Sequence, residues 1–226
     1  MRKQFIKNIK GLVQVGENLP DQLRGAQMNQ LPVIENAYLA LEDNEVIAYG
    51  PMDEWPGITD WRDVEVIDAT NCFVLPAFID SHTHTVFAAS REEEFVDRIN
   101  GLTYEEIAAK GGGILNSAQK LQLQSEDELF TAALSRVQKI KAAGTGALEI
   151  KSGYGLTEKD ELRSLEIASQ FSDETTLLAA HVIPEEFKSD PDSYVDLIIK
   201  SIIPKSSSKW IDVFCDQGAF TPDQAE

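Results

Sequence analysis

Residues 73–87, FVLPAFIDSHTHTVF, guide the interpretation of the whole chain. An apolar run leads into Asp80, His82 and His84, which occupy every second position. Side chains of a strand alternate between its two faces, so these three are predicted to project to the same side. Two imidazoles one strand period apart can bind one cation, because neutral imidazole is a common metal ligand. The stretch therefore predicts a buried strand that ends in a metal site.

The simpler interpretation of an isolated His-x-His is a polar turn after a strand. Here the pair ends an apolar run and contains two of only three histidines in the chain. The context therefore favours the metal site.

The segment LPAFIDSHTH resembles the first barrel strand of the amidohydrolase superfamily of metal-dependent hydrolases. Five more blocks follow in order: TVFAASREEEF, NGLTYEEIAAKGGGIL, LEIKSGYGLT, AAHVIPEEF and DVFCDQGAFT. Together they resemble the imidazolonepropionase family within that superfamily. Two departures are Ala77 and Ala89, where the family pattern leads us to expect glycine. Each adds only one methyl group.

The expected fold class is α/β, with a small β-sandwich domain followed by the N-terminal part of an amidohydrolase (β/α)8 barrel. Short apolar runs separated by turn-forming clusters predict an antiparallel sandwich over residues 1–72. Over residues 73–226 strands alternate with helices, which is typical of parallel β/α units. The predicted strands are 73–82, 147–152, 176–182 and 211–215, and the clearest predicted helices are 125–143, 158–171 and 191–202.

About four β/α units are predicted, whereas a closed barrel needs eight and ~250 residues. The second region is therefore expected to be the first half of a longer, truncated barrel. A compact α/β fold of four parallel strands is the alternative, although it would expose two sheet edges.

The resemblance implies that His82 and His84 bind one Zn²⁺ or Fe³⁺ per chain in the complete enzyme. It also implies that the substrate-binding residues are Arg91, Tyr104, Tyr154 and His181. The remaining metal ligands of the family, its catalytic glutamate and its catalytic histidine correspond to positions beyond Glu226. The catalytic residues are therefore unknown from this sequence.

Each substrate-binding candidate also has a structural interpretation. A guanidinium matches a carboxylate in bidentate geometry, but Arg91 could equally pair with Glu92 to Glu94 at the surface. The two tyrosines could donate phenol hydrogen bonds or simply pack. His181 could be a core histidine, and Asp80 could orient a metal ligand or act as a structural carboxylate.

The implied reaction is metal-dependent hydrolysis of the cyclic amide of 4-imidazolone-5-propanoate to N-formimino-L-glutamate in histidine catabolism. This chain alone is expected to be inactive, and the full-length form to be a homodimer. Two alternatives remain: another amidohydrolase, such as a ring aminohydrolase or deaminase, and a non-catalytic half-barrel fragment.

Composition limits the partners. The net charge of −18 argues against binding nucleic acid or an anionic membrane surface, because both would repel the chain. No apolar run approaches the ~20 residues of a membrane span, so a cytoplasmic location is the expectation. Cys72 and Cys215 match no metal-binding spacing and are expected to be buried as small hydrophobic residues. The Gly111–Gly113 run lacks the features of a phosphate-binding P-loop.

Overall fold

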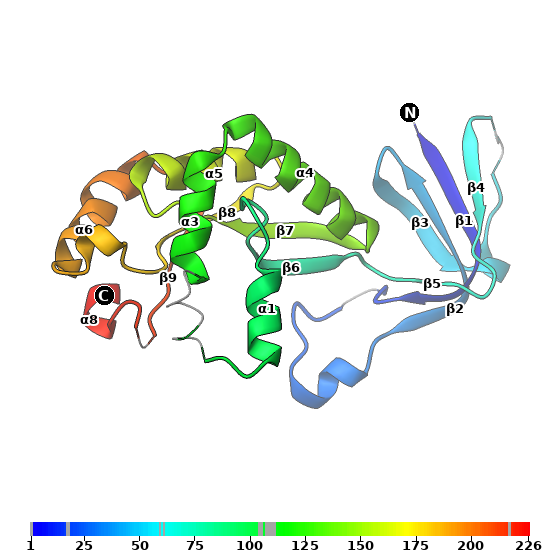
Figure 1. The fold of residues 1–226 in the computed structure, drawn as a ribbon. Coiled ribbons are helices and arrows are strands. Elements are labelled where there is room, and N and C mark those ends of the chain that lie inside the picture. The colour runs from blue at the N-terminus through cyan, green and yellow to red at the C-terminus, as the bar shows by residue number, and fades with distance from the viewer. Residues whose placement is uncertain are drawn as a thin grey trace. The chain divides into compact units, whose positions relative to one another are not determined.

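The computed structural model of the chain describes residues 2–16, 19–58, 60, 62–103, 106, 112–216 and 218–226. It divides into two compact units, an N-terminal unit of Met1–Pro76 and a C-terminal unit of Ala77–Glu226. The strands and most of the α-helices of both units are labelled in Figure 1. No helix in these described ranges has the length and hydropathy needed to cross a membrane.

The N-terminal unit is built on one mixed sheet. Its elements are β1 (Lys3–Val13), η1 (Gly25–Asn29), β2 (Val33–Glu42), β3 (Glu45–Pro51), η2 (Met52–Glu54), β4 (Val64–Asp68) and β5 (Phe73–Val74). The strand order is β3-β2-β1-β4, and β5 also pairs with β1. Asp43 and Asn44 both have positive φ at the β2–β3 turn, as a type I′ hairpin requires.

Two apolar clusters stabilise this sheet. Ile9, Leu12 and Ala37 are buried in one, and Phe5 stacks on Trp55 in the other at a ring-centre distance of 4.4 Å. The predicted antiparallel sandwich is not confirmed. The described residues of this unit form one sheet, in which β4 and β5 both run parallel to β1.

The C-terminal unit combines a parallel sheet with helices. Its strands are β6 (Phe78–Thr83), β7 (Thr145–Lys151), β8 (Glu174–Ala180) and β9 (Trp210–Val213). They pair in parallel in the order β6-β7-β8-β9. The helical segments are α1 (Glu92–Ile99), α3 (Gly113–Leu123), α4 (Glu126–Ala142), α5 (Glu158–Ser169), η3 (Glu185–Phe187), α6 (Pro191–Leu197), η4 (Ile198–Ile202), α7 (Ile203–Lys205) and α8 (Pro222–Ala225).

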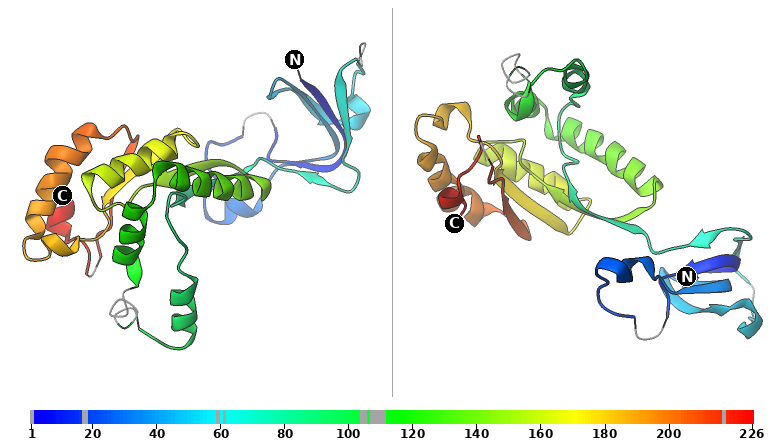
Figure 2. Two further views of the ribbon diagram at one scale, coloured as in Figure 1. Left: turned by 45° about the horizontal axis from the view of Figure 1, so that its top comes forward. Right: turned by 90° about the horizontal axis from the view of Figure 1, so that it is seen from below.

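Helices α4 and α5 pack on one face of this sheet (Figures 1 and 2). Leu129 and Val137 of α4 join Ile150 of β7 and Ile167 of α5 in one buried cluster. Side chains from all four strands line an open pocket of about 660 Å³. The unit is therefore a mixed α/β structure with a parallel half-barrel sheet.

Helix α4 begins and ends close to the limits predicted from the sequence, residues 125–143. Ser125 accepts a hydrogen bond from the N–H of Glu128, and the Glu128 carboxylate accepts one from the N–H of Ser125. This reciprocal pair is a capping box, and it begins the helix where the sequence predicts a helix over residues 125–143. Gly144, with φ of +103°, follows the helix in a conformation that favours glycine.

Three sequence predictions were wrong. The strand expected over residues 73–82 is two strands: β5 pairs in the N-terminal sheet and β6 in the C-terminal sheet. Pro76 lies between them and has no N–H to continue a ladder. The strand predicted to carry the metal site is also exposed: β6 has one neighbouring strand among the described residues, and 76% of Ile79 is accessible. Both Cys72 and Cys215 are exposed.

Candidate metal and substrate site

Three predicted site residues meet beyond the carboxyl ends of neighbouring strands. His84 follows β6, Tyr154 lies in the loop after β7, and His181 follows β8 directly. The ring centre of His84 lies 5.1 Å from that of Tyr154 and 5.6 Å from that of His181, on which it stacks. The rings of Tyr154 and His181 are 5.5 Å apart. Parallel strands end at one rim, which explains how residues distant in sequence form this cluster.

His82 and His84 have ring centres 5.8 Å apart. Imidazoles that share one zinc at Zn–N distances of about 2.0–2.1 Å have ring centres roughly 5–6 Å apart, so the pair fits a common cation. No group of three or more His, Cys, Asp or Glu side chains arranged for a metal occurs within the described residues. Among the described residues, the pair is therefore a candidate for two ligands and not for a complete metal site.

The tautomer of His84 follows from its surroundings. Its Nδ1 lies 3.0 Å from the carbonyl oxygen of Ser152, which can only accept, so Nδ1 carries the proton. Burial lowers the pKa of His84 to about 4, with a further contribution from His181. The ring is therefore neutral at pH 7, and its Nε2 lone pair is available to a ligand.

His181 is held in the same way. Its Nδ1 donates to the carbonyl oxygen of Gly153 at 2.8 Å, and burial lowers the pKa of the ring. Gly153 has φ of +112°, and a β-carbon there would lie 2.9 Å from this Nδ1. Only glycine allows so close an approach of the backbone to the ring.

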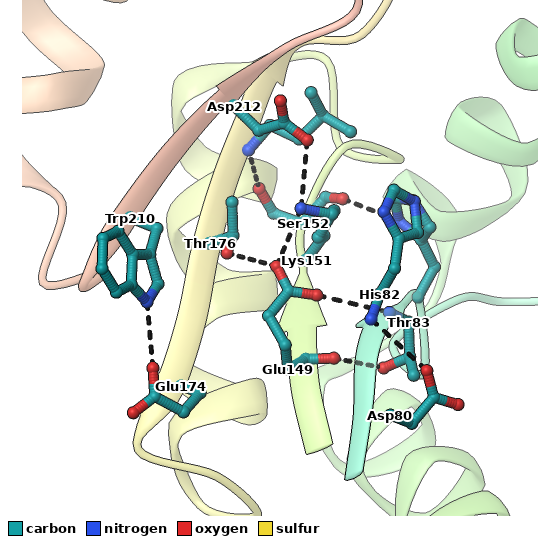
Figure 3. Close-up of polar contacts among 12 residues, drawn as sticks. Asp80, His82, Thr83, Glu149, Lys151, Ser152, Glu174, Thr176, Trp210 and Asp212 are labelled. Carbon is teal, nitrogen blue, oxygen red and sulfur yellow. Dashed lines mark hydrogen bonds and ion pairs between the residues drawn. The ribbon is translucent and has the colours of Figure 1, made fainter. Parts of the chain in front are cut away.

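Asp80 does not contact the ring of His82 in the way expected of a group that orients a metal ligand. Its Oδ1 accepts a hydrogen bond from the backbone N–H of His82 at 3.3 Å (Figure 3). The carboxylate therefore acts on the backbone of β6.

Arg91 lines a pocket of about 240 Å³ with His84, Phe87, Ala89, Ser90, Ser117 and Tyr154. Its Nη1 lies 3.6 Å from Oε2 of Glu94, as the surface-pair interpretation predicted. Glu94 also accepts a hydrogen bond from the N–H of Gly113 at 2.8 Å. Arg91 thus faces the pocket while partly paired. Tyr104 lies outside the described residues.

Sequence reasoning missed a polar network that crosses the sheet. Lys151, with 8% of its side chain exposed, lies 2.8 Å from Glu149 and 3.0 Å from Asp212. Glu149 accepts hydrogen bonds from Thr176 and from the N–H of Thr83, the residue between the two histidines (Figure 3). The alternation Glu149-x-Lys151 in an apolar strand was the available signal, since both side chains project to one face.

Comparison with solved structures shows the fold. The guanine deaminase from C. acetobutylicum is 12% identical with a TM-score of 0.50, covering 97% of this chain and 48% of that one. The triazine hydrolase from Arthobacter aurescens is 13% identical with a TM-score of 0.54, covering 99% and 49%. No protein-family model matches the chain.

Curated sequences give a much stronger likeness. The imidazolonepropionase of Christiangramia forsetii is 46% identical over 96% of this chain and 54% of its own length. That of Flavobacterium johnsoniae is 42% identical over 98% of this chain and 56% of its own length. That of Geobacillus kaustophilus is 39% identical over 100% of this chain and 56% of its own length. The chain spans about half the length of the curated relatives it matches. It is a homologue of the imidazolonepropionases over nearly all of its residues.

Proposed function

We propose that this chain is the N-terminal part of a metal-dependent hydrolase that opens the cyclic amide of 4-imidazolone-5-propanoate to give N-formimino-L-glutamate. The observation that carries the proposal is the meeting of His84, Tyr154 and His181 at one rim, beside the pocket that Arg91 lines. The likeness to imidazolonepropionases over 96–100% of the chain supports the same reaction.

The proposed fold is the first four β/α units of a (β/α)8 barrel, of which β6 is the first strand. The region 1–72 is a separate domain, a sandwich that segments outside this sequence complete. The parallel order of the C-terminal sheet and the two fold neighbours support this arrangement.

His82 and His84 are the proposed ligands of a Zn²⁺ or Fe³⁺ ion, since imidazole suits both metals. Such an ion supplies Lewis-acid activation of water at neutral pH. Within the chain, the Ser152 carbonyl accepts the Nδ1 proton of His84. The lone pair on Nε2 is then the one that can bind the cation. This hydrogen bond also fixes the orientation of the ring.

The proposed substrate contacts follow from charge and hydrogen-bonding capacity. The Arg91 guanidinium binds the propanoate carboxylate, because its planar fork matches two carboxylate oxygens. Tyr154 and Tyr104 donate phenol hydrogen bonds to the substrate. His181, protonated on Nδ1, presents Nε2 as an acceptor for a ring N–H. The substrate is thereby oriented with its ring toward the histidine pair.

The proposed setting is a cytoplasmic homodimer in the full-length form, without nucleic-acid or membrane partners. The formal charge of −18 supports the last point, since polyanions and anionic lipid would repel the chain.

A ring-opening assay tests the reaction. Loss of the ultraviolet absorbance of 4-imidazolone-5-propanoate is followed with this chain and with a version extended through the strands that its relatives possess. We expect turnover only from the extended, metal-loaded form. Turnover by this chain alone would contradict the half-barrel proposal. Turnover of guanine by the extended form, without turnover of the imidazolone, would favour an aminohydrolase.

Zinc titration of this chain tests the metal ligands. Two imidazoles provide fewer ligands than the three of a catalytic zinc site, so weak, reversible binding is expected. Both His82→Ala and His84→Ala should abolish that binding, whereas Arg91→Ala, the matched control in the same pocket, should leave it unchanged. Binding that survives both histidine substitutions would place the metal elsewhere.

A further inference from the structure

The backbone that follows β7 contacts both half-buried histidines of the site, His84 and His181. The carbonyl of Ser152 accepts the Nδ1 proton of His84 at 3.0 Å, and the next carbonyl, of Gly153, accepts that of His181 at 2.8 Å. Consecutive peptide groups therefore determine the tautomers of two imidazoles from two other strands.

The carboxylate of Glu161, in α5, accepts hydrogen bonds from the N–H groups of this same backbone segment. Its Oε2 accepts from Gly153 at 2.9 Å, and its Oε1 accepts from Gly155 and from Leu156 at 2.8 Å each. The residue has no exposed surface. A buried carboxylate thus takes three backbone donors from one short loop.

The loop conformation is not one that the local sequence favours by itself. Leu156 has φ of +57°, a left-handed conformation that is unfavourable for a residue other than glycine. A β-carbon at Gly155 would lie 2.5 Å from the backbone of Asp160 and Glu161. Strained backbone of this kind persists where surrounding contacts over-determine it. Glu161 accepts from three N–H groups of the loop, and Gln122 and Tyr194 donate to the carbonyls of Gly155 and Leu156.

The hydrogen bonds favour the ionised form of the carboxyl group. Burial raises the pKa of Glu161 above its ordinary value, and the hydrogen bonds from the Ser152 hydroxyl and from the N–H groups of Leu156, Gly155 and Gly153 only partly offset that rise. A carboxylate that accepts several backbone N–H bonds resembles an anion bound in a backbone nest.

We infer that Glu161 is a positioning residue, which fixes residues 152–156 so that two adjacent carbonyls keep His84 and His181 protonated on Nδ1. Both Nε2 atoms then remain free, one for the cation and one for the substrate. These two uses of Nε2 rest on the proposed function, but the control of the tautomers does not.

Glu161→Gln tests the inference. The amide replaces one acceptor oxygen by a donor NH2 group, so at least one loop N–H loses its partner. The matched control is Glu166→Gln, an exposed position on the same helix. The tautomers are read from long-range ¹H–¹⁵N spectra of histidine-labelled, metal-free protein.

In the wild-type chain and in the Glu166→Gln variant, His84 and His181 should both show the Nδ1–H tautomer. In the Glu161→Gln variant, the ¹⁵N shifts of both rings should move toward those of a mixed population. Identical spectra for the two variants, or an Nε2–H tautomer in the wild type, would overturn the inference.

If the Glu161→Gln variant does not fold, amide hydrogen exchange of the wild type tests whether Glu161 holds the loop. The N–H groups of Gly153, Gly155 and Leu156 should then exchange slowly, and exchange at the rate of an exposed loop would overturn the inference. None of these measurements needs a metal or a substrate. If the tautomers respond but zinc does not bind, the proposed function fails and the positioning role stands.

Discussion

The inner and outer strands of the C-terminal sheet differ sharply in burial. In β8 every residue from Thr175 to Ala180 is buried, and in β7 Ile150 is fully buried. In β6 the exposed fraction of Phe78 is 67%, and in β9 that of Trp210 is 55%. All four strands contain large apolar side chains, so composition does not explain the difference.

The number of neighbours does explain it. In the part of the chain that the structure describes, β7 and β8 each lie between two strands, whereas β6 and β9 are edges with one neighbour each. Exposed apolar edges are liabilities that folded proteins usually cover. Under the proposed function, further barrel strands would cover both edges. The comparison teaches that a strand's sequence sets its potential for burial, and that its neighbours decide whether burial occurs.

A paired substitution in two adjacent strands should give the largest contrast. Leu177 of β8 and Ile211 of β9 are register partners, with 0% and 54% of their surfaces exposed. Leu177→Ala should lower the free energy of unfolding by about 3–5 kcal/mol through lost burial and a cavity. Ile211→Ala should cost about 0.5 kcal/mol or less, as surface substitutions do. Urea unfolding measures both, and equal losses would remove the distinction between inner and edge strands.

The polar network should show an intermediate effect, because it links the inner strands to the edges. Lys151→Met leaves the carboxylates of Glu149 and Asp212 without their shared cation. Removing one partner of a fully buried pair costs 3–5 kcal/mol, and partial exposure of Asp212 reduces the expected loss to about 2 kcal/mol.

The control is Lys159→Met, at an exposed position of α5, which should change stability by less than about 0.5 kcal/mol. Thermal or urea unfolding of both variants gives the comparison. A Lys151→Met protein as stable as this control would show that the network contributes nothing to the sheet.

The smallest effect is expected at the outer edge. Ile79 of β6 is 76% exposed, so Ile79→Ser should change the stability of this chain by about 0.5 kcal/mol or less. In a version extended to a full barrel, the same substitution should cost about 1.5–3 kcal/mol, because the side chain would then be buried. Unfolding of both forms tests this, and an equal, small cost in the two would argue against coverage of β6.

Much of the fold was predictable because it depends on local spacing. The capping box at Ser125 needs only a hydroxyl and a carboxylate three residues apart. Strand–helix alternation gave the parallel sheet, although observed strand limits differ by a few residues, as in β8 (Glu174–Ala180 against 176–182). The break at Pro76 was missed because the apolar run continues on both sides of it.

The site divides in the same way. Its components, above all the His82 and His84 pair, could be chosen from the sequence, since residue type and spacing define what they can do chemically. The control of two imidazoles by Glu161, and the sharing of Glu149 and Asp212 by Lys151, depend on which backbone and side-chain atoms meet across separate elements. Sequence alone determined the candidate reactive groups and the strand faces predicted for them. Only the tertiary structure decided their tautomers, partners and burial, because those properties arise from contacts between segments distant along the chain.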